Sequence, residues 1–219
     1  MPRHFEIELD QLRTNIIKMG SLVDEQIDLA IAALLESNME RAKFVIERDK
    51  KVDEYDNLID AQCERIFALS QPVAIDLRLI MAALEINHEL ERVGDIAVNI
   101  AERALPLQHY GNLIKISKVS EMSNIAREMI KHAIDSFVNN DPELARKILT
   151  EDDVVDEFNR NIFYQLVAEM KSNPEIIEPA MHIIILSRHL ERLADHATNI
   201  AEDVVFLVDA KIIKHHAEG

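Results

Sequence analysis

The chain has 219 residues, of which 48% are hydrophobic, enough to build a core in one large domain or two small ones. Forty acidic residues against 24 basic ones give a formal net charge of −16, which argues against direct binding to nucleic acid or anionic lipid. With only 4 Gly and 6 Pro to interrupt them, long helices are expected. Cys63 is the only cysteine, and no signal peptide or membrane span is visible, which favours a cytoplasmic protein without direct membrane insertion.

Six long helices are predicted from the spacing of apolar residues and from helix-start signals. They run over about residues 5–36, 40–69, 72–104, 113–138, 142–171 and 175–210. Ser37 and Asn38 end the first helix and cap the second, and Asp141 caps the fifth. Pro72 and Pro174 begin the third and sixth helices, at a position where proline is tolerated.

The chain also contains an internal repeat. The segment LERVGDIAVNIAE begins at residue 90 and LERLADHATNIAE at residue 190, and nine of their thirteen positions are identical. A second pair of segments, residues 42–59 and 145–162, matches at an offset of 103. Three helices per repeat with short connections predict an all-α fold of two tandem three-helix up-down-up bundles, residues 1–107 and 108–219.

Acidic pairs recur at equivalent positions of the two repeats. Glu91 and Asp95 are four residues apart, so they share one helix face, which points away from the apolar stripe of the same helix. Asp49 and Asp53 form a similar pair on the preceding helix. The turn between these helices lies about 20 residues from either pair, so an antiparallel hairpin brings the four carboxylates to one level.

The second repeat has the same arrangement on both sides of the turn near Pro174. Acid pairs at this spacing also occur by chance on solvated helix faces, but chance does not explain their recurrence at matching heights in both halves. Crowded carboxylates repel one another, and a cation relieves that repulsion. An all-oxygen set favours hard cations such as Fe³⁺, Mn²⁺, Mg²⁺ or Ca²⁺ over structural Zn²⁺. The predicted metal ligands are Asp49, Asp53, Glu91, Asp95, Asp152, Asp156, Glu191 and Asp195.

Several polar residues near these pairs are candidates for further metal ligands or for ordinary surface and packing residues. Four of them continue the same helix faces, and their spacing suits a metal ligand and a surface residue equally well. These four are Asn99, Glu102, Asn199 and Glu202. Three nearby histidines are interpreted as surface or packing residues rather than ligands, namely His88, His189 and His196.

The motifs resemble those of the PhoU family of phosphate-transport accessory and regulatory proteins. The resemblance rests on SQPVAIDLRLIMAALEINHELERVGDIAVNIAE (70–102), on RHLERLADHATNIAE (188–202), and on the D-x-x-x-D segments at residues 49 and 152. It covers nearly the whole chain. It implies two three-helix bundles, each with a metal-cluster site on the acids named above. The family also implies signalling between the phosphate ABC transporter and the sensor kinase, which keeps the phosphate-starvation response off. The run NPEIIEPAM departs from the family pattern without touching the acids.

The predicted function is therefore a metal-binding regulatory adaptor rather than an enzyme, holding multinuclear iron or another hard cation such as Mn or Mg. Its predicted partners are the transporter's ATPase and the phosphate-sensing histidine kinase, and the sequence leaves open whether it forms a homodimer. One alternative is a ferritin-like di-metal oxidase, which needs two E-x-x-H motifs. EINH at 85–88 supplies one, but the equivalent ILSR does not. A purely structural helical adaptor without metal is the other alternative.

Overall fold

The computed structural model describes residues 2–73, 75–211 and 213, and every regular element within them is a helix. The elements are α1 (Pro2–Leu35), α2 (Met39–Arg48), α3 (Lys50–Leu69), α4 (Ile75–Leu107), α5 (Gly111–Ser117), α6 (Val119–Asn139), α7 (Pro142–Ile148), α8 (Asp152–Ser172), the 3-10 turn η1 (Pro174–Ile176) and α9 (Ile177–Asp209). The predicted all-α fold of two tandem three-helix bundles is confirmed. No described helix is long and apolar enough to cross a membrane.

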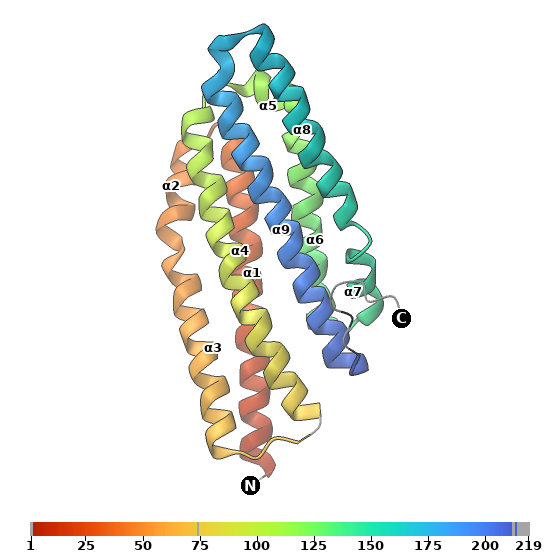
Figure 1. Cartoon of the computed structure of the whole chain (residues 1–219). Coiled ribbons are helices and arrows are strands. Elements are labelled where there is room, and N and C mark those ends of the chain that lie inside the picture. Colours follow the sequence, from red (N-terminus) through yellow and green to blue (C-terminus); the bar gives the residue numbers. More distant parts are fainter. Residues whose placement is uncertain (1, 74, 212, 214–219) are drawn as a thin grey trace.

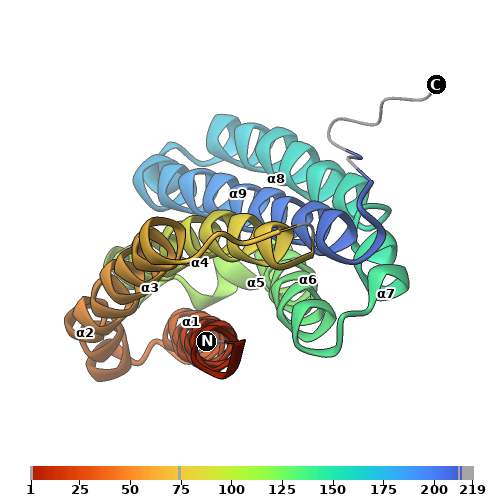
Figure 2. The same ribbon diagram turned by 90° about the horizontal axis from the view of Figure 1, so that it is seen from below.

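The two bundles lie side by side with their long axes roughly aligned (Figure 1). The first bundle consists of α1, the α2–α3 pair and α4, and the second consists of α6, the α7–α8 pair and α9. Helix α4 packs along α9, and α1 contacts α6, so four inner helices join the bundles. Seen from below, α3 and α8 lie outside α4 and α9 (Figure 2). The acid-rich second and fifth predicted helices therefore form the outer layer.

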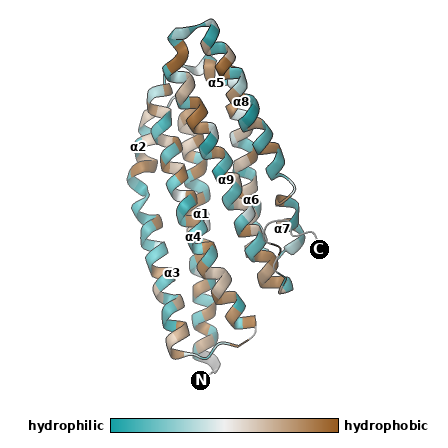
Figure 3. Cartoon of the chain, in the orientation of Figure 1, coloured by the Kyte–Doolittle hydropathy of each residue, from teal (hydrophilic) through white to brown (hydrophobic). Residues whose placement is uncertain are grey.

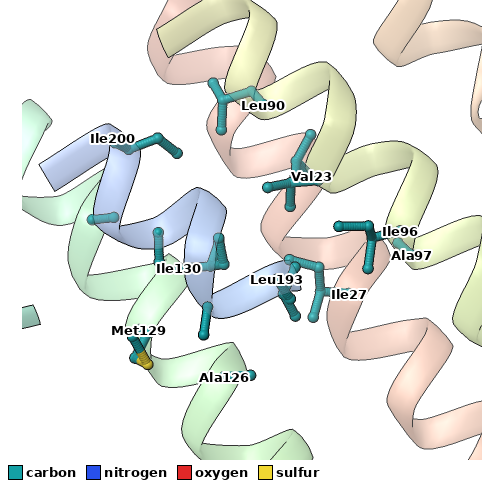
Figure 4. Close-up of a cluster of buried hydrophobic side chains, with 14 of the residues drawn as sticks. Val23, Ile27, Leu90, Ile96, Ala97, Ala126, Met129, Ile130, Leu193 and Ile200 are labelled. Atoms are coloured by element: carbon teal, nitrogen blue, oxygen red, sulfur yellow. The ribbon is translucent and has the colours of Figure 1, made fainter. Parts of the chain in front are cut away.

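One continuous hydrophobic core runs through both bundles. Figure 4 shows part of it, with Val23 of α1, Ile96 of α4, Ile130 of α6 and Leu193 of α9 in one cluster of buried side chains. The outer helix α3, by contrast, is mostly hydrophilic (Figure 3). Because the core does not divide at the repeat boundary, the predicted domain limits of 1–107 and 108–219 stay a prediction.

Three of the predicted long helices are interrupted. The second breaks at Asp49, where Val52 N–H bonds the Asp49 carbonyl at 2.7 Å in a tighter turn than the α-helical one. The fifth breaks over residues 149–151, again with bonds between residues three apart. The fourth breaks at Lys118, whose left-handed backbone (φ 59°) cannot continue a helix. The predictions of uninterrupted helices over 40–69, 113–138 and 142–171 are therefore wrong at these points.

The predicted helix caps at Asn38 and Asp141 are confirmed. Asn38 Oδ1 accepts a hydrogen bond from Arg41 N at 3.1 Å, and Asp141 Oδ1 accepts bonds from two backbone N–H groups at 3.0 Å. The residue before each cap, Ser37 or Asn140, has a positive φ, so both repeats make the same turn between their first and second helices.

The two proline-started helices begin later than predicted. Helix α4 begins at Ile75 rather than at Pro72. Pro174 opens the turn η1, whose N-cap Asn173 accepts a bond from Glu175 N at 3.2 Å, and α9 begins at Ile177. The acid pairs of α4 and α9 lie well inside both helices, so this difference does not move them.

Candidate metal centres

The first predicted centre lies where the α2–α3 junction meets α4. Asp49 occupies the junction itself, and Asp53 lies in the first turn of α3, where the helix dipole favours negative charge. Gly94 of α4 allows the close approach, since a Cβ atom there would stand 3.1 Å from Val52 Cγ1 and 3.5 Å from Asp49 Oδ1. The glycine therefore brings the backbone of α4, next to Asp95, against the broken part of the outer helix.

Burial and mutual repulsion both act on the carboxylates of this centre. Burial raises the pKa of Asp49 above its usual value, and repulsion from Asp53 and Asp95 raises it further. The pKa of Glu91 is likewise raised, first by burial and then by the charges of Asp95, Asp56 and Asp53. The charges of the four predicted ligands of the first repeat thus act on one another, and Asp56 acts on Glu91 as well, but among the described residues no three of the predicted ligands offer oxygens within 4.8 Å of one another.

The second predicted centre repeats this arrangement between α8 and α9. Burial raises the pKa of Asp152 to about 6, helped by repulsion from Asp195, Asp156 and Glu191. The pKa of Glu191 is raised by burial and by Asp156 and Asp195, against the opposing charge of Arg188. The pKa of Asp195 is also raised, first by burial and then by Asp156. The charges of all four predicted ligands of the second repeat therefore act on one another, but in the described part of the chain no three of them offer oxygens within 4.8 Å of one another.

The two clusters are suited to binding cations. Their carboxylates lie at the surface of the outer hairpins, either half-buried or exposed, so an ion can reach them without entering the core. The raised pKa values indicate that the negative charges are unfavourable where they stand, and a bound cation would offset that cost. Carboxylate oxygens are ligands that hard cations prefer. The residues therefore fit the predicted ions, although the assignment of individual ligands stays a prediction.

Hydrogen bonds from the neighbouring turn orient some of these acids. Asn159 Nδ2 donates to Glu191 Oε2 at 2.9 Å, and Ser187 Oγ donates to Asn159 Oδ1 at 2.8 Å. At the equivalent place in the first repeat, Asn87 Nδ2 donates to Asp56 Oδ1 at 2.7 Å. Contacts of this kind fix carboxylate side chains in one orientation before an ion binds.

The four residues of uncertain role are engaged in other ways. Asn99 Nδ2 donates to the backbone oxygen of Asp95 at 2.9 Å, within its own helix. Asn199 Nδ2 donates to Glu89 Oε2 at 3.0 Å, across the boundary between the bundles. Glu202 lines an apolar groove, and Glu102 is exposed. Neither of these hydrogen bonds reaches the carboxylate group of a predicted ligand.

A buried polar contact between the bundles was missed in the sequence analysis. His196 of α9 lies with Nδ1 2.6 Å from Oε2 of Glu89 on α4, and both side chains are nearly inaccessible to solvent. Burial alone would raise the pKa of Glu89, but hydrogen bonds from His196 and Asn199 outweigh it and lower the pKa. Nothing in the spacing within either repeat predicts this contact, since the partners are 107 residues apart.

Comparison with known proteins identifies the family. The PhoU domain matches the chain twice, over residues 16–104 and 119–204. The chain belongs to the PhoU family. Each PhoU match contains one complete set of four predicted ligands, from Asp49 to Asp95 in the first and from Asp152 to Asp195 in the second. The sequence repeat, the two bundles and the two carboxylate clusters thus all follow the same division.

Relatives in this family match the chain over nearly its full length. A protein of Aquifex aeolicus, named phosphate-specific transport system accessory protein PhoU homolog, is 41% identical over 95% of this chain and 94% of its own. A Pseudomonas putida protein of the same name is 35% identical over 97% of this chain and 84% of its own. The crystal structure of PhoU from Pseudomonas aeruginosa superposes with a TM-score of 0.90 at 35% identity, covering 94% of this chain and 100% of that one. The family assignment thus rests on both sequence and fold.

Proposed function

We propose that this protein is a phosphate-transport accessory protein that acts as a metal-binding regulatory adaptor. The observation that carries the proposal is the pair of repeated carboxylate clusters on the outer hairpins of a PhoU chain. Acids whose pKa values are raised by burial and by one another lower the stability of the fold when they are ionised. Their presence at matching places in both repeats is best explained by a cation that each cluster holds.

Each cluster would hold its own ions, multinuclear iron or another hard cation such as Mn²⁺ or Mg²⁺. In the first repeat the ligands would be Asp49, Asp53, Glu91 and Asp95, and in the second Asp152, Asp156, Glu191 and Asp195. Bound metal would turn a negative surface into one that attracts anions, such as phosphate or an acidic group of a partner protein. The residues themselves bind and position the ions.

The regulatory part of the proposal draws on the named relatives. They are called accessory proteins of the phosphate-specific transport system, and a Streptococcus pneumoniae structure with a TM-score of 0.86 at 26% identity is titled a phosphate transport system regulatory protein. We infer that this chain, in the cytoplasm, links the ATPase of a phosphate ABC transporter to a phosphate-sensing histidine kinase and represses the phosphate-starvation response. Whether it does so as a homodimer is part of the same test.

The ferritin-like oxidase is the less favoured candidate. Such a site needs carboxylates and two E-x-x-H motifs that project into a four-helix core. Here the inner helices α1, α4, α6 and α9 meet mainly through apolar side chains, with the Glu89–His196 contact between α4 and α9, and the predicted acid clusters lie on the outer hairpins. Of the one available E-x-x-H, Glu85 is exposed and His88 faces Asp60. A purely structural adaptor leaves the repeated acid clusters without a role.

Metal analysis of paired variants tests the two centres. Asp53→Asn with Asp95→Asn should lose the metal of the first repeat and keep that of the second. Asp156→Asn with Asp195→Asn should do the reverse. Elemental analysis of the purified proteins measures both, with Glu169→Gln, an exposed acid of α8, as the control. Loss of all metal from either double variant would show one shared site and contradict the two-centre arrangement.

Gene deletion and binding measurements test the regulatory role. Deletion should switch on phosphate-starvation genes in phosphate-rich medium, and the purified protein should bind the transporter's ATPase or the kinase directly. The metal-loaded protein should show no ferroxidase or phosphatase turnover. The enzyme alternative should replace this proposal if the genes stay repressed and the protein has a turnover that Asp95→Asn abolishes.

A further inference from the structure

We propose that Asp56, Asp60 and His88 form a third metal site, present only in the first repeat, that binds one divalent transition-metal ion such as Zn²⁺. Among the described residues, these three side chains each offer a ligand atom, and the three atoms all lie within 4.8 Å of one another. His88 Nε2 stands 3.5 Å from Asp60 Oδ1. Two ligands bonded at about 2.1 Å to a tetrahedral ion lie roughly 3.4 Å apart, so only small side-chain movements are needed.

A buried amide beneath the three side chains also points to a ligand. Asn87 is fully buried, and its Nδ2 donates to Asp56 Oδ1 at 2.7 Å and to Asp60 Oδ1 at 3.0 Å. Its Oδ1 is also buried and has no hydrogen-bond partner. A buried oxygen without a hydrogen-bond partner is unfavourable. Rotating the Asn87 amide by half a turn would direct its Oδ1 at the carboxylates of Asp56 and Asp60. That orientation is favourable only when a cation lies between the amide oxygen and the carboxylates.

The site borders the first carboxylate cluster, since Asp56 also acts on Glu91, but it is not repeated, because the second repeat lacks its residues. At the offsets that align the repeats, Asp56 and Asp60 correspond to Asn159 and Phe163, and His88 corresponds to Arg188. In the second repeat these residues line a groove beside Glu191, and Arg188 Nε lies 3.5 Å from Glu191 Oε2. Neither arginine nor phenylalanine offers a ligand atom for a metal ion, so the second repeat cannot form the same site.

The ligand set favours a different metal from that of the carboxylate clusters. An imidazole nitrogen is a softer ligand than a carboxylate and suits zinc, copper or nickel rather than Mg²⁺ or Ca²⁺. Two carboxylates and one imidazole give three protein ligands and leave a position for water or for the Asn87 oxygen. The side chains of His88 and Asp60 are 45% and 39% exposed, so an ion can enter from solvent without opening the bundle.

Zinc titration of the untagged full-length protein tests this proposal. The ring nitrogen signals of His88, observed by ¹⁵N NMR, should shift until one equivalent of Zn²⁺ has been added to this site. Equilibrium dialysis should show that His88→Gln loses one equivalent, or binds it at least tenfold more weakly, and Asp60→Asn should do the same. Because both side chains are partly exposed, neither change should prevent folding, which circular dichroism checks.

Three further proteins make the result specific. His109→Gln alters an exposed histidine outside the site and should leave zinc binding unchanged. The double variants Asp53→Asn/Asp95→Asn and Asp156→Asn/Asp195→Asn remove the proposed hard-cation centres and should keep the His88 signal, so failure of those centres is distinguishable from failure of this one. The proposal is overturned if Zn²⁺ leaves the His88 signals unmoved or if His88→Gln binds as much zinc as the wild-type protein.

Discussion

At the residue scale, Asp152 has the most perturbed carboxylate in the two clusters. Its pKa is raised from 3.8 to about 6, chiefly by burial and then by the nearby charges of Asp195 and Asp156. At neutral pH the folded protein therefore holds an anion that the unfolded chain would solvate more favourably. Binding energy from a metal ion must overcome this cost, which is highest when all the acids are ionised.

This shift predicts how stability depends on pH. Between about pH 4 and pH 6 the folded state binds more protons at Asp152 than the unfolded state, so its contribution to stability improves as the pH falls. Asp152→Asn should raise the melting temperature of the chelator-treated protein at pH 7 and reduce its rise on acidification. Thermal denaturation at pH 5, 6 and 7 measures both, with Glu169→Gln as the control. A lower melting temperature for the variant at pH 7 would contradict this account.

At the element scale, the contact between α4 and the broken outer helix depends on the small residue at position 94. A Cβ on Gly94 would already press on Val52 at 3.1 Å, and the equivalent residue of α9 is Ala194. Only small side chains let the third helix of each bundle approach the junction where the first acid pair lies. The spacing of these helices thus sets how close the acid pairs come.

A larger side chain at position 94 should separate these elements. Gly94→Val places two methyl groups where Val52 and Asp49 stand, and overpacking of this kind costs about 1–3 kcal/mol in the free energy of unfolding. Urea denaturation measures the loss. Gly111→Val is the matched control, because a Cβ there meets no atom within 4 Å and no loss is expected. Equal stability of the two variants would show that the approach is not tight.

The caps between helices give a second prediction at this scale. Asp141 accepts hydrogen bonds from the backbone N–H groups of Glu143 and Leu144, at the start of α7. Asp141→Ala should lower the free energy of unfolding by about 1 kcal/mol. Asn161→Ala changes an exposed residue of α8 and should stay within about 0.5 kcal/mol of wild type in the same denaturation experiment. A loss no larger than that of the control would mean that solvent replaces the cap.

At the scale of the whole molecule, the two bundles are joined by apolar packing and by polar contacts, of which one between α4 and α9 is almost fully buried. Glu89 of α4 meets His196 and Asn199 of α9, and the first two side chains are nearly inaccessible to solvent. Glu89 lies two residues before Glu91, and His196 follows Asp195. The contact therefore connects the helix segments that carry the proposed ligands of the two centres.

Removing this contact should destabilise the whole protein. Glu89→Ala leaves the buried His196 ring without its hydrogen-bond partner, and an unsatisfied buried polar group costs about 1–3 kcal/mol. Glu89→Gln keeps the shape and an oxygen acceptor, so its loss should be smaller. Glu85→Ala alters an exposed acid one turn earlier on α4 and serves as the control. Thermal and urea denaturation of the three variants should rank Glu89→Ala lowest, and any other order would refute a structural role for the contact.

The sequence by itself determined the features that depend on neighbouring residues along one helix. Periodic apolar residues indicated the helices, Asn38 and Asp141 indicated the caps, and the recurrence of acid pairs indicated two equivalent clusters. These features follow from the helical repeat and from short-range hydrogen bonds, which act within a few residues. The spacing of Asp49, Asp53, Asp56 and Asp60 along one face was visible too, and could have extended the first cluster.

The tertiary structure alone decided how the elements meet. The helix breaks at Asp49 and Lys118, the burial of Glu89 against His196, and the approach of His88 to Asp60 involve backbone adjustments or partners from separate helices. Apolar periodicity states which face of a helix is buried but not which other helix covers it. That choice depends on packing the whole chain into one core, because each buried side chain must fit neighbours that are distant in sequence.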